Sequence, residues 1–132
     1  MHIDDLKLHY NAYVDCLNKQ NWPILGQFVS TTVRYNGKTV GLSGYRDMLM
    51  QDYKAIPDLQ FNIGFLVCEP TAVACILNFD CTPVGYLFDL PVQGRRVRFA
   101  EHVFYTYEDE KIKSVWSVID KAAIAAQLQR ER

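Results

Sequence analysis

The hydrophobic periodicity of the chain changes once, at Pro57-Asp58, and this change constrains the fold more than any other feature of the sequence. Before it, apolar residues recur every three or four positions, which predicts amphipathic helices over residues 2–20 and 43–56. After it, apolar residues alternate with smaller or polar ones over residues 59–79, the period of two that is typical of strands. Helices followed by antiparallel strands predict an α+β fold, in which one curved sheet wraps around the helices and encloses a pocket.

The remaining segments complete the predicted order of elements. Pro23 opens a short helical turn, residues 31–40 form a strand that contains Asn36-Gly37, and Ser43 caps the helix that follows. A hairpin over residues 95–120 then leads to a closing helix that begins at Lys121. A chain of 132 residues suits one domain with one core, and we expect a single domain over residues 1–132.

Charge and composition limit the classes of binding partner that the chain can have. Fourteen basic and fifteen acidic residues leave a net charge of −1, so nothing attracts the chain to nucleic acid or to an acidic membrane, and we expect a hydrophobic small molecule as partner. Four cysteines without a C-x-x-C pair, no apolar run of membrane-spanning length and no signal-peptide pattern predict a cytoplasmic protein with reduced thiols. Because His2 and His9 lack partners at ligand spacing, we expect no metal, and no cofactor motif is present.

Ionisable residues lie among apolar ones in the hairpin. Glu101 and His102 are adjacent on its first strand, and Trp116 and Asp120 lie on its second. In apolar surroundings a carboxyl group can be tuned for proton transfer. This hairpin is therefore the predicted location of a small active site.

The turn of the hairpin decides which of these groups face the pocket. If the turn is even, Tyr107 pairs with Ile112, and Glu101 shares the inner face with Asp120 while His102 points outward. A three-residue turn or a bulge reverses this and brings His102 inside. Amphipathicity favours Glu101, and we keep His102 as the alternative.

Two nearby carboxyl groups in an apolar cone would not both ionise readily, so one pKa should rise and leave an acid and a base at neutral pH. We expect Asp120 to take a proton alpha to a carbonyl group. Asn36, Tyr35 or the protonated carboxyl group would donate a hydrogen bond to the developing enolate oxygen. The candidate substrate-binding residues are the aromatic ones Tyr35, Tyr45, Tyr53, Phe61, Phe79, Tyr105 and Trp116.

Each candidate also has a structural interpretation. Asp120 can simply be the N-cap of the closing helix, His102 can be a surface residue at a subunit interface, and Asn36 can belong to a turn. The aromatic candidates can all be core residues. In the even register Phe104, Val115 and Ile119 fall on the outer face of the sheet, and burying them against a second copy predicts a homodimer.

Across almost its whole length the chain resembles the SnoaL-like polyketide cyclases, or ester cyclases, of the NTF2-like superfamily. The matching stretches are AYVDCLNKQNW, VRYNG, GYRDML, AIPDLQF, PVQGRRVRF and EDEKIKSVWSVID. The resemblance implies a helix-lined cone that commonly dimerises and needs no cofactor, and ring closure by aldol chemistry. The family's acid/base Asp, its Asn and its His match Asp120, Asn36 and His102.

The sequence departs from the family pattern at three positions. Glu110 replaces a common Gly in the hairpin turn, and Ile76 and Pro83 replace an Arg and a His, which makes the pocket mouth less polar. The first hypothesis is a cofactor-independent cyclase, lyase or isomerase of secondary metabolism that acts on a polyketide-like carbonyl compound. The alternatives are a non-catalytic protein that binds small molecules in the same pocket, and an interaction module built on the outer face of the sheet.

Overall fold

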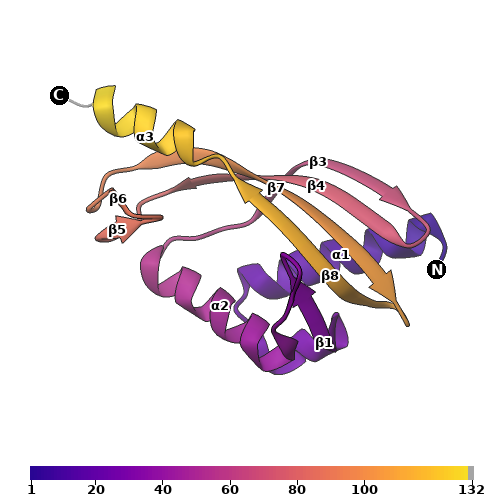
Figure 1. Ribbon diagram of the computed structural model, residues 1–132. Helices are drawn as coiled ribbons and strands as arrows, with labels where there is room; N and C mark the ends of the chain where they lie inside the picture. Colours follow the sequence, from indigo (N-terminus) through magenta and orange to yellow (C-terminus); the bar gives the residue numbers. More distant parts are fainter. Residues whose placement is uncertain (131–132) are drawn as a thin grey trace.

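The computed structural model describes residues 1–130, and these form an α+β fold with a curved, unclosed sheet (Figure 1). Residues 131 and 132, the last two of the expected domain, lie outside the described part. The helices are α1 (Ile3–Asn18), the 3-10 helix η1 (Trp22–Gln27), α2 (Gly41–Ala55) and α3 (Lys121–Arg130). The strands are β1 (Val29–Tyr35), β2 (Lys38–Thr39), β3 (Asn62–Glu69), β4 (Ala72–Cys81), β5 (Tyr86–Leu87), β6 (Leu90–Pro91), β7 (Val97–Glu108) and β8 (Lys111–Ile119).

In this part of the chain the main sheet has six strands in the order β2-β1-β8-β7-β4-β3, and β5 and β6 pair separately. The prediction of an antiparallel sheet is wrong for one pair, because β1 runs parallel to β8. The N–H of Ile112 donates to the carbonyl of Phe28 at 2.8 Å, so both strands start at the same end of the sheet. No hairpin joins them in sequence, and nothing local therefore imposes an antiparallel pairing.

Helices α1 and α2 cover the concave face of the sheet, whereas α3 and the β5–β6 hairpin lie at one end of it (Figure 1). Tyrosines from the helices meet tyrosines of the core: the hydroxyl of Tyr10 donates to that of Tyr105 at 3.1 Å. The hydroxyls of Tyr13 and Tyr45 lie 2.7 Å apart. These bonds satisfy phenol groups that burial separates from water.

The start of α2 differs from the prediction. The helix begins at Gly41, with Val40 as N-cap and no side-chain cap, so Ser43 lies inside the first turn. Gly41 has φ 73°, a conformation that glycine adopts without strain and that turns the chain from β2 into the helix. Within residues 1–130 no helix is long and apolar enough to cross a membrane.

A bulge in β8 changes which of its residues face inward. Tyr107 pairs with Ile112, as the even turn predicts, but Thr106 pairs with Ser114, so one extra residue lies between these pairs. From there to Ile119 the strand has the opposite parity to the prediction. Trp116 is 44% exposed on the outer face, and the expectation that it faces inward is wrong.

The same bulge turns Val115, Ser117 and Ile119 inward, so Val115 and Ile119 do not belong to the outer face as predicted. A second bulge, at Gly64 between Ile63 and Phe65, reverses the parity of β3. It leaves Phe65 exposed.

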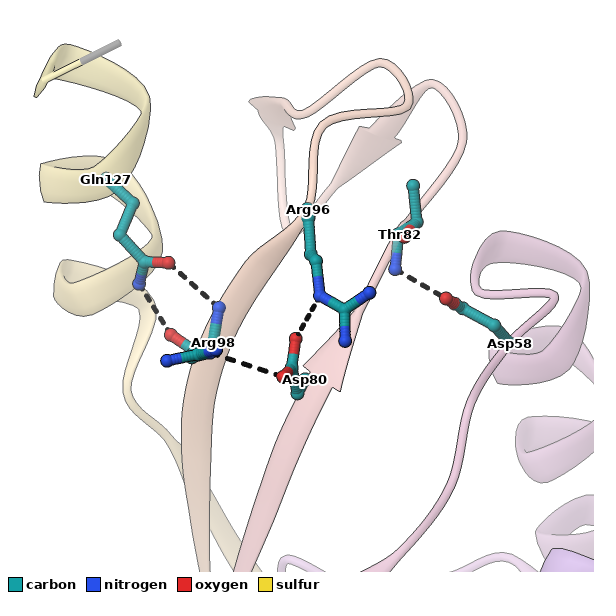
Figure 2. A network of polar contacts seen from close by, with 6 residues as sticks. All are labelled: Asp58, Asp80, Thr82, Arg96, Arg98 and Gln127. Carbon is teal, nitrogen blue, oxygen red and sulfur yellow. Dashed lines mark hydrogen bonds and ion pairs between the residues drawn. The ribbon is translucent and has the colours of Figure 1, made fainter.

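Helix α3 is fixed beside β7 by side-chain bonds to backbone (Figure 2). The N–H of Arg98 donates to Gln127 Oε1 at 2.8 Å, and Gln127 Nε2 donates to the carbonyl of Arg98 at 2.5 Å. Arg95 donates to the carbonyls of Gln127 and Leu128 near the end of α3. Asp80 accepts hydrogen bonds from Arg98 on the neighbouring strand β7 and from Arg96 just before that strand.

Candidate functional site

The concave side of the sheet encloses a cavity with an inner and an outer part, of about 50 Å³ and about 130 Å³. The two parts share the lining residues Tyr35, Met48, Asp52, Phe61 and Glu101. The inner part extends toward the tyrosines of α1, α2 and β7, and the outer part toward Leu87, Phe88, Phe99 and Ile119. An apolar chamber with a few polar groups in its wall is the usual form of a small-molecule site.

Glu101 lines both parts of the cavity from the inner face of β7. The bulge places His102 on the same face as Trp116, as the alternative register predicts, but this face is the outer one, so His102 points away from the cavity. The hydroxyl of Ser117 donates a hydrogen bond to Glu101 Oε2. Burial raises the pKa of Glu101, and the hydrogen bond from Ser117 acts in the opposite direction because it stabilises the carboxylate.

The second carboxyl group of the cavity is Asp52, on α2, which the sequence analysis missed. Met48 lies four positions before it and Ile56 four positions after it, so helical periodicity places Asp52 on the same face as these two apolar residues. Asp52 is exposed, so water reaches part of its surface. Even so, the surrounding protein raises its pKa to about 7, and the negative charge of Glu101 adds to this rise.

The two groups are coupled electrostatically. The negative charge of ionised Glu101 raises the pKa of Asp52, which is about 7. When Glu101 is ionised, the cavity therefore contains a carboxylate on β7 and, below about pH 7, a carboxylic acid on α2. The sequence predicts Asp120 as the second carboxyl group of the cavity and as the base; the group that lies beside Glu101 in the structure is Asp52.

Ser117 also links Tyr35 to the pair. Burial raises the pKa of Tyr35, and its hydrogen bond with Ser117 acts in the opposite direction. Asn36 follows Tyr35 in a tight turn and is exposed, and its Oδ1 accepts a hydrogen bond from the N–H of Ser117 at 2.9 Å. The structure thus places Tyr35 in the cavity wall, whereas Asn36 holds the end of β1 against β8.

Three other candidates lie away from the cavity wall. Asp120 is exposed, and its Oδ1 accepts a hydrogen bond from the N–H of Ala123 at 3.1 Å, which is the N-cap arrangement of α3. His102 and Trp116 are exposed on the outer face of the sheet. Trp116 faces outward because of the bulge in β8. Asp120 lies between the end of β8 and the start of α3.

Most of the aromatic candidates do line the cavity. Tyr35, Tyr45, Phe61 and Tyr105 border its inner part, and Phe79 its outer part. Tyr53 is instead a core residue whose hydroxyl donates to the carbonyl of Leu17 at 2.7 Å. None of the described residues that border either part is Lys, Arg or His. In residues 1–130 no three potential metal ligands come together.

Comparisons with known proteins agree with this architecture. The model of the SnoaL-like polyketide cyclase family matches residues 7–128. A SnoaL-like polyketide cyclase from Agrobacterium tumefaciens is 53% identical, with a TM-score of 0.93 over 97% of this chain and 99% of that one. A comparison with curated proteins gives no match.

More distant structures share the fold alone. AclR from Streptomyces galilaeus, a proposed hydroxylase, is 19% identical with a TM-score of 0.79 over 99% of this chain and 100% of that one. IdmH from Streptomyces antibioticus, a proposed polyketide cyclase, is 15% identical with a TM-score of 0.81 over 94% of this chain and 98% of that one. Since one fold carries different proposed reactions, the chemistry has to be argued from the site.

Proposed function

The chain belongs to the SnoaL-like polyketide cyclase family, and from this premise we propose that it is a cofactor-independent cyclase or isomerase acting on a hydrophobic, polyketide-like carbonyl compound. The observation that carries the proposal is the pair of Glu101 and Asp52 in the wall of one aromatic cavity, both with a raised pKa. Enolisation requires a base that removes a proton and an acid that stabilises the enolate, both in the wall of the same cavity.

In the proposed mechanism the Glu101 carboxylate removes a proton from the carbon next to a carbonyl group. Protonated Asp52, with the Tyr35 hydroxyl as a second donor, stabilises the negative charge that develops on the carbonyl oxygen. In an isomerisation the proton returns to a different carbon. In a cyclisation the enolate carbon attacks a second carbonyl group of the same molecule, and the new alkoxide takes its proton from Asp52.

The charge of the cavity wall supports a neutral substrate. Its described ionisable groups are two carboxyl groups and several phenols, without a cationic side chain to receive a carboxylate or a phosphate. A buried anion without a partner costs several kcal/mol. A ketone or a keto ester, by contrast, needs only hydrogen-bond donors and apolar surface.

Deuterium exchange tests the proposal without the natural substrate. The protein is incubated in D2O with a panel of neutral aryl ketones and β-keto esters, and loss of the proton next to the carbonyl group is followed by NMR. We expect deuterium exchange to be faster with the protein than in buffer alone. In the Glu101→Gln, Asp52→Asn double variant the exchange rate should equal that in buffer alone.

The alternative is a non-catalytic protein that uses the same cavity to hold an apolar ligand. It predicts binding of the same ketones, measured by calorimetry, together with exchange no faster in the wild type than in the double variant. That result would replace the catalytic proposal.

We also propose that the protein works in the cytoplasm as a homodimer joined through the outer face of the sheet. The support is a group of five exposed apolar side chains on β3, β7 and β8, here named the outer patch: Phe65, Val67, Phe104, Trp116 and Val118. They form adjacent rows across paired strands, with His102 beside them. Apolar groups gathered on one face in this way are typical of a protein interface.

A further inference from the structure

The tip of the β5–β6 hairpin has a backbone conformation that its sequence does not favour. Two residues, Phe88 and Asp89, connect the strands, with φ 51° and 64°. A turn with two positive φ values normally contains Asn and Gly, because side chains with a Cβ atom crowd the backbone there. For a bulky residue such as Phe this conformation is an outlier that the surrounding structure must stabilise.

The contacts of the Phe88 ring show what stabilises it. The ring lines the outer part of the cavity and meets Phe99 edge to face, with 6.3 Å between centroids and 88° between planes. Lys121 Nζ, at the start of α3, lies 5.2 Å from the centre of the same ring. The ring therefore bridges the hairpin, β7 and α3 at the mouth of the cavity.

The rest of the hairpin is held independently of this ring. Leu87 and Val92 are buried, and the N–H of Val84 donates to the carbonyl of Ala55 at 2.9 Å, which fixes the base of the loop to the end of α2. The hairpin thus has its own anchors, and the ring at its tip adds an aromatic wall to the cavity.

We propose that Phe88 is a specificity-determining residue, whose ring, together with Phe99, selects flat aromatic ligands over globular ones of equal size. The inference rests on the proposed function, because it concerns the substrate of the same cavity. Phe79 stacks on Phe99 at 5.1 Å and extends this wall inward. Aromatic walls favour flat rings, which can stack on them or meet them edge to face.

The test compares two neutral methyl ketones with the same number of carbon atoms, flat 2-acetylnaphthalene and globular 1-acetyladamantane. Their dissociation constants are measured by displacement of the fluorescent aryl ketone prodan. The variant is Phe88→Asn, because Asn accepts a positive φ and lacks the ring. The matched control is Tyr86→Asn, which removes an exposed aromatic ring from the same hairpin outside the cavity wall.

We expect the wild type and Tyr86→Asn to bind 2-acetylnaphthalene more tightly than 1-acetyladamantane. In Phe88→Asn the ratio of the two dissociation constants should change by about tenfold toward equal binding, as expected for one lost aromatic contact. An unchanged preference in Phe88→Asn would overturn the proposal. So would a loss of preference of the same size in Tyr86→Asn. Because ligand displacement needs no proton transfer, a failed deuterium-exchange experiment would leave this result intact.

Discussion

At the scale of single residues, the main feature of the cavity is that its two carboxyl groups have different surroundings. The Ser117 hydroxyl stabilises Glu101 as an anion, whereas Asp52 lies next to the negative charge of Glu101. Burial raises the pKa of both groups. The hydrogen bond from Ser117 to Glu101 supports the proposed roles of Glu101 as the base and Asp52 as the acid.

The first prediction concerns the pH dependence of proton exchange. The active form has Glu101 ionised and Asp52 protonated, so the rate should fall as the pH rises through about 7, the pKa of Asp52. In Asp52→Asn that fall should disappear, and the rate at pH 6 should be lower by roughly a factor of 100. NMR exchange rates at about pH 5 to 9, a range that spans the pKa of about 7, provide the measurement.

Asp47→Asn is the matched control, because Asp47 is an exposed residue of the same helix. Its pH profile should equal that of the wild type. A rate that rises through pH 7 in the wild type would instead show that Asp52 is the base. Glu101→Gln should abolish exchange over the whole range if the assignment is correct.

The second prediction concerns Asp120. As the N-cap of α3 it accepts a hydrogen bond from Ala123, so Asp120→Ala should lower the free energy of unfolding by about 1 kcal/mol. Since its carboxyl group lies outside the cavity wall, exchange should continue at the wild-type rate. Urea unfolding and NMR exchange on the same sample measure both effects, and a large loss of exchange in a stable variant would restore Asp120 as the catalytic base.

At the scale of elements, the sequence predicts the order of helices and strands but not the parity of each strand. The alternation of Val73, Cys75, Leu77 and Phe79 predicts the buried face of β4, because β4 pairs with β7 without a bulge. On β8 one extra residue before Ser114 shifts the alternation, so that Ser117 lies on the inner face in place of Trp116. Nothing in the apolar pattern marks that residue, since both faces of β8 carry large apolar side chains.

The candidate site shows the same limit. Glu101 was predictable because β7 alternates cleanly up to the hairpin turn, where Tyr107 pairs with Ile112. The helical spacing of Asp52 could have predicted that it faces the core. A single carboxyl group on an apolar helix face is, however, a weaker signal for an active site than the adjacent Glu101 and His102. Its proximity to Glu101 comes from the packing of α2 across the sheet, which periodicity does not specify.

The third prediction concerns the attachment of α3. Beyond Ile119 strand β8 no longer covers β7, and the Gln127 side chain bonds the N–H and carbonyl of Arg98 instead (Figure 2). Gln127→Ala leaves both groups without this partner, so we expect a loss of about 1 to 3 kcal/mol in unfolding free energy. Gln129→Ala, at an exposed position of the same helix, should change it by less than about 0.5 kcal/mol.

Hydrogen exchange of the Arg98 amide distinguishes local from global effects. If Gln127 protects this amide, its exchange should accelerate in Gln127→Ala more than that of amides in the centre of β4. Equal loss of stability in both variants would mean that α3 is held by apolar packing alone.

At the scale of the whole molecule, the two faces of the sheet have different chemistry. The inner face carries the carboxyl and phenol groups of the cavity, and the outer face carries the outer patch. The bulges at Gly64 and before Ser114 create this difference, because they turn Phe65 and Trp116 outward. The irregularities that define the cavity wall therefore also define the surface proposed for dimerisation.

The last prediction tests that surface. Phe104 pairs with Trp116 across β7 and β8 and is 53% exposed, so Phe104→Lys should place charges inside the proposed interface without disturbing the core. We expect a dimer in sedimentation of the wild type at micromolar concentration, and a dissociation constant at least roughly a hundredfold higher in Phe104→Lys. Leu8→Lys is the control, because Leu8 is 71% exposed on α1, away from the patch. A wild-type monomer at that concentration would exclude this interface. Equal weakening of the dimer by both substitutions would also exclude it, because a dimer joined through the outer patch should be weakened by a charge inside the patch and not by one on α1.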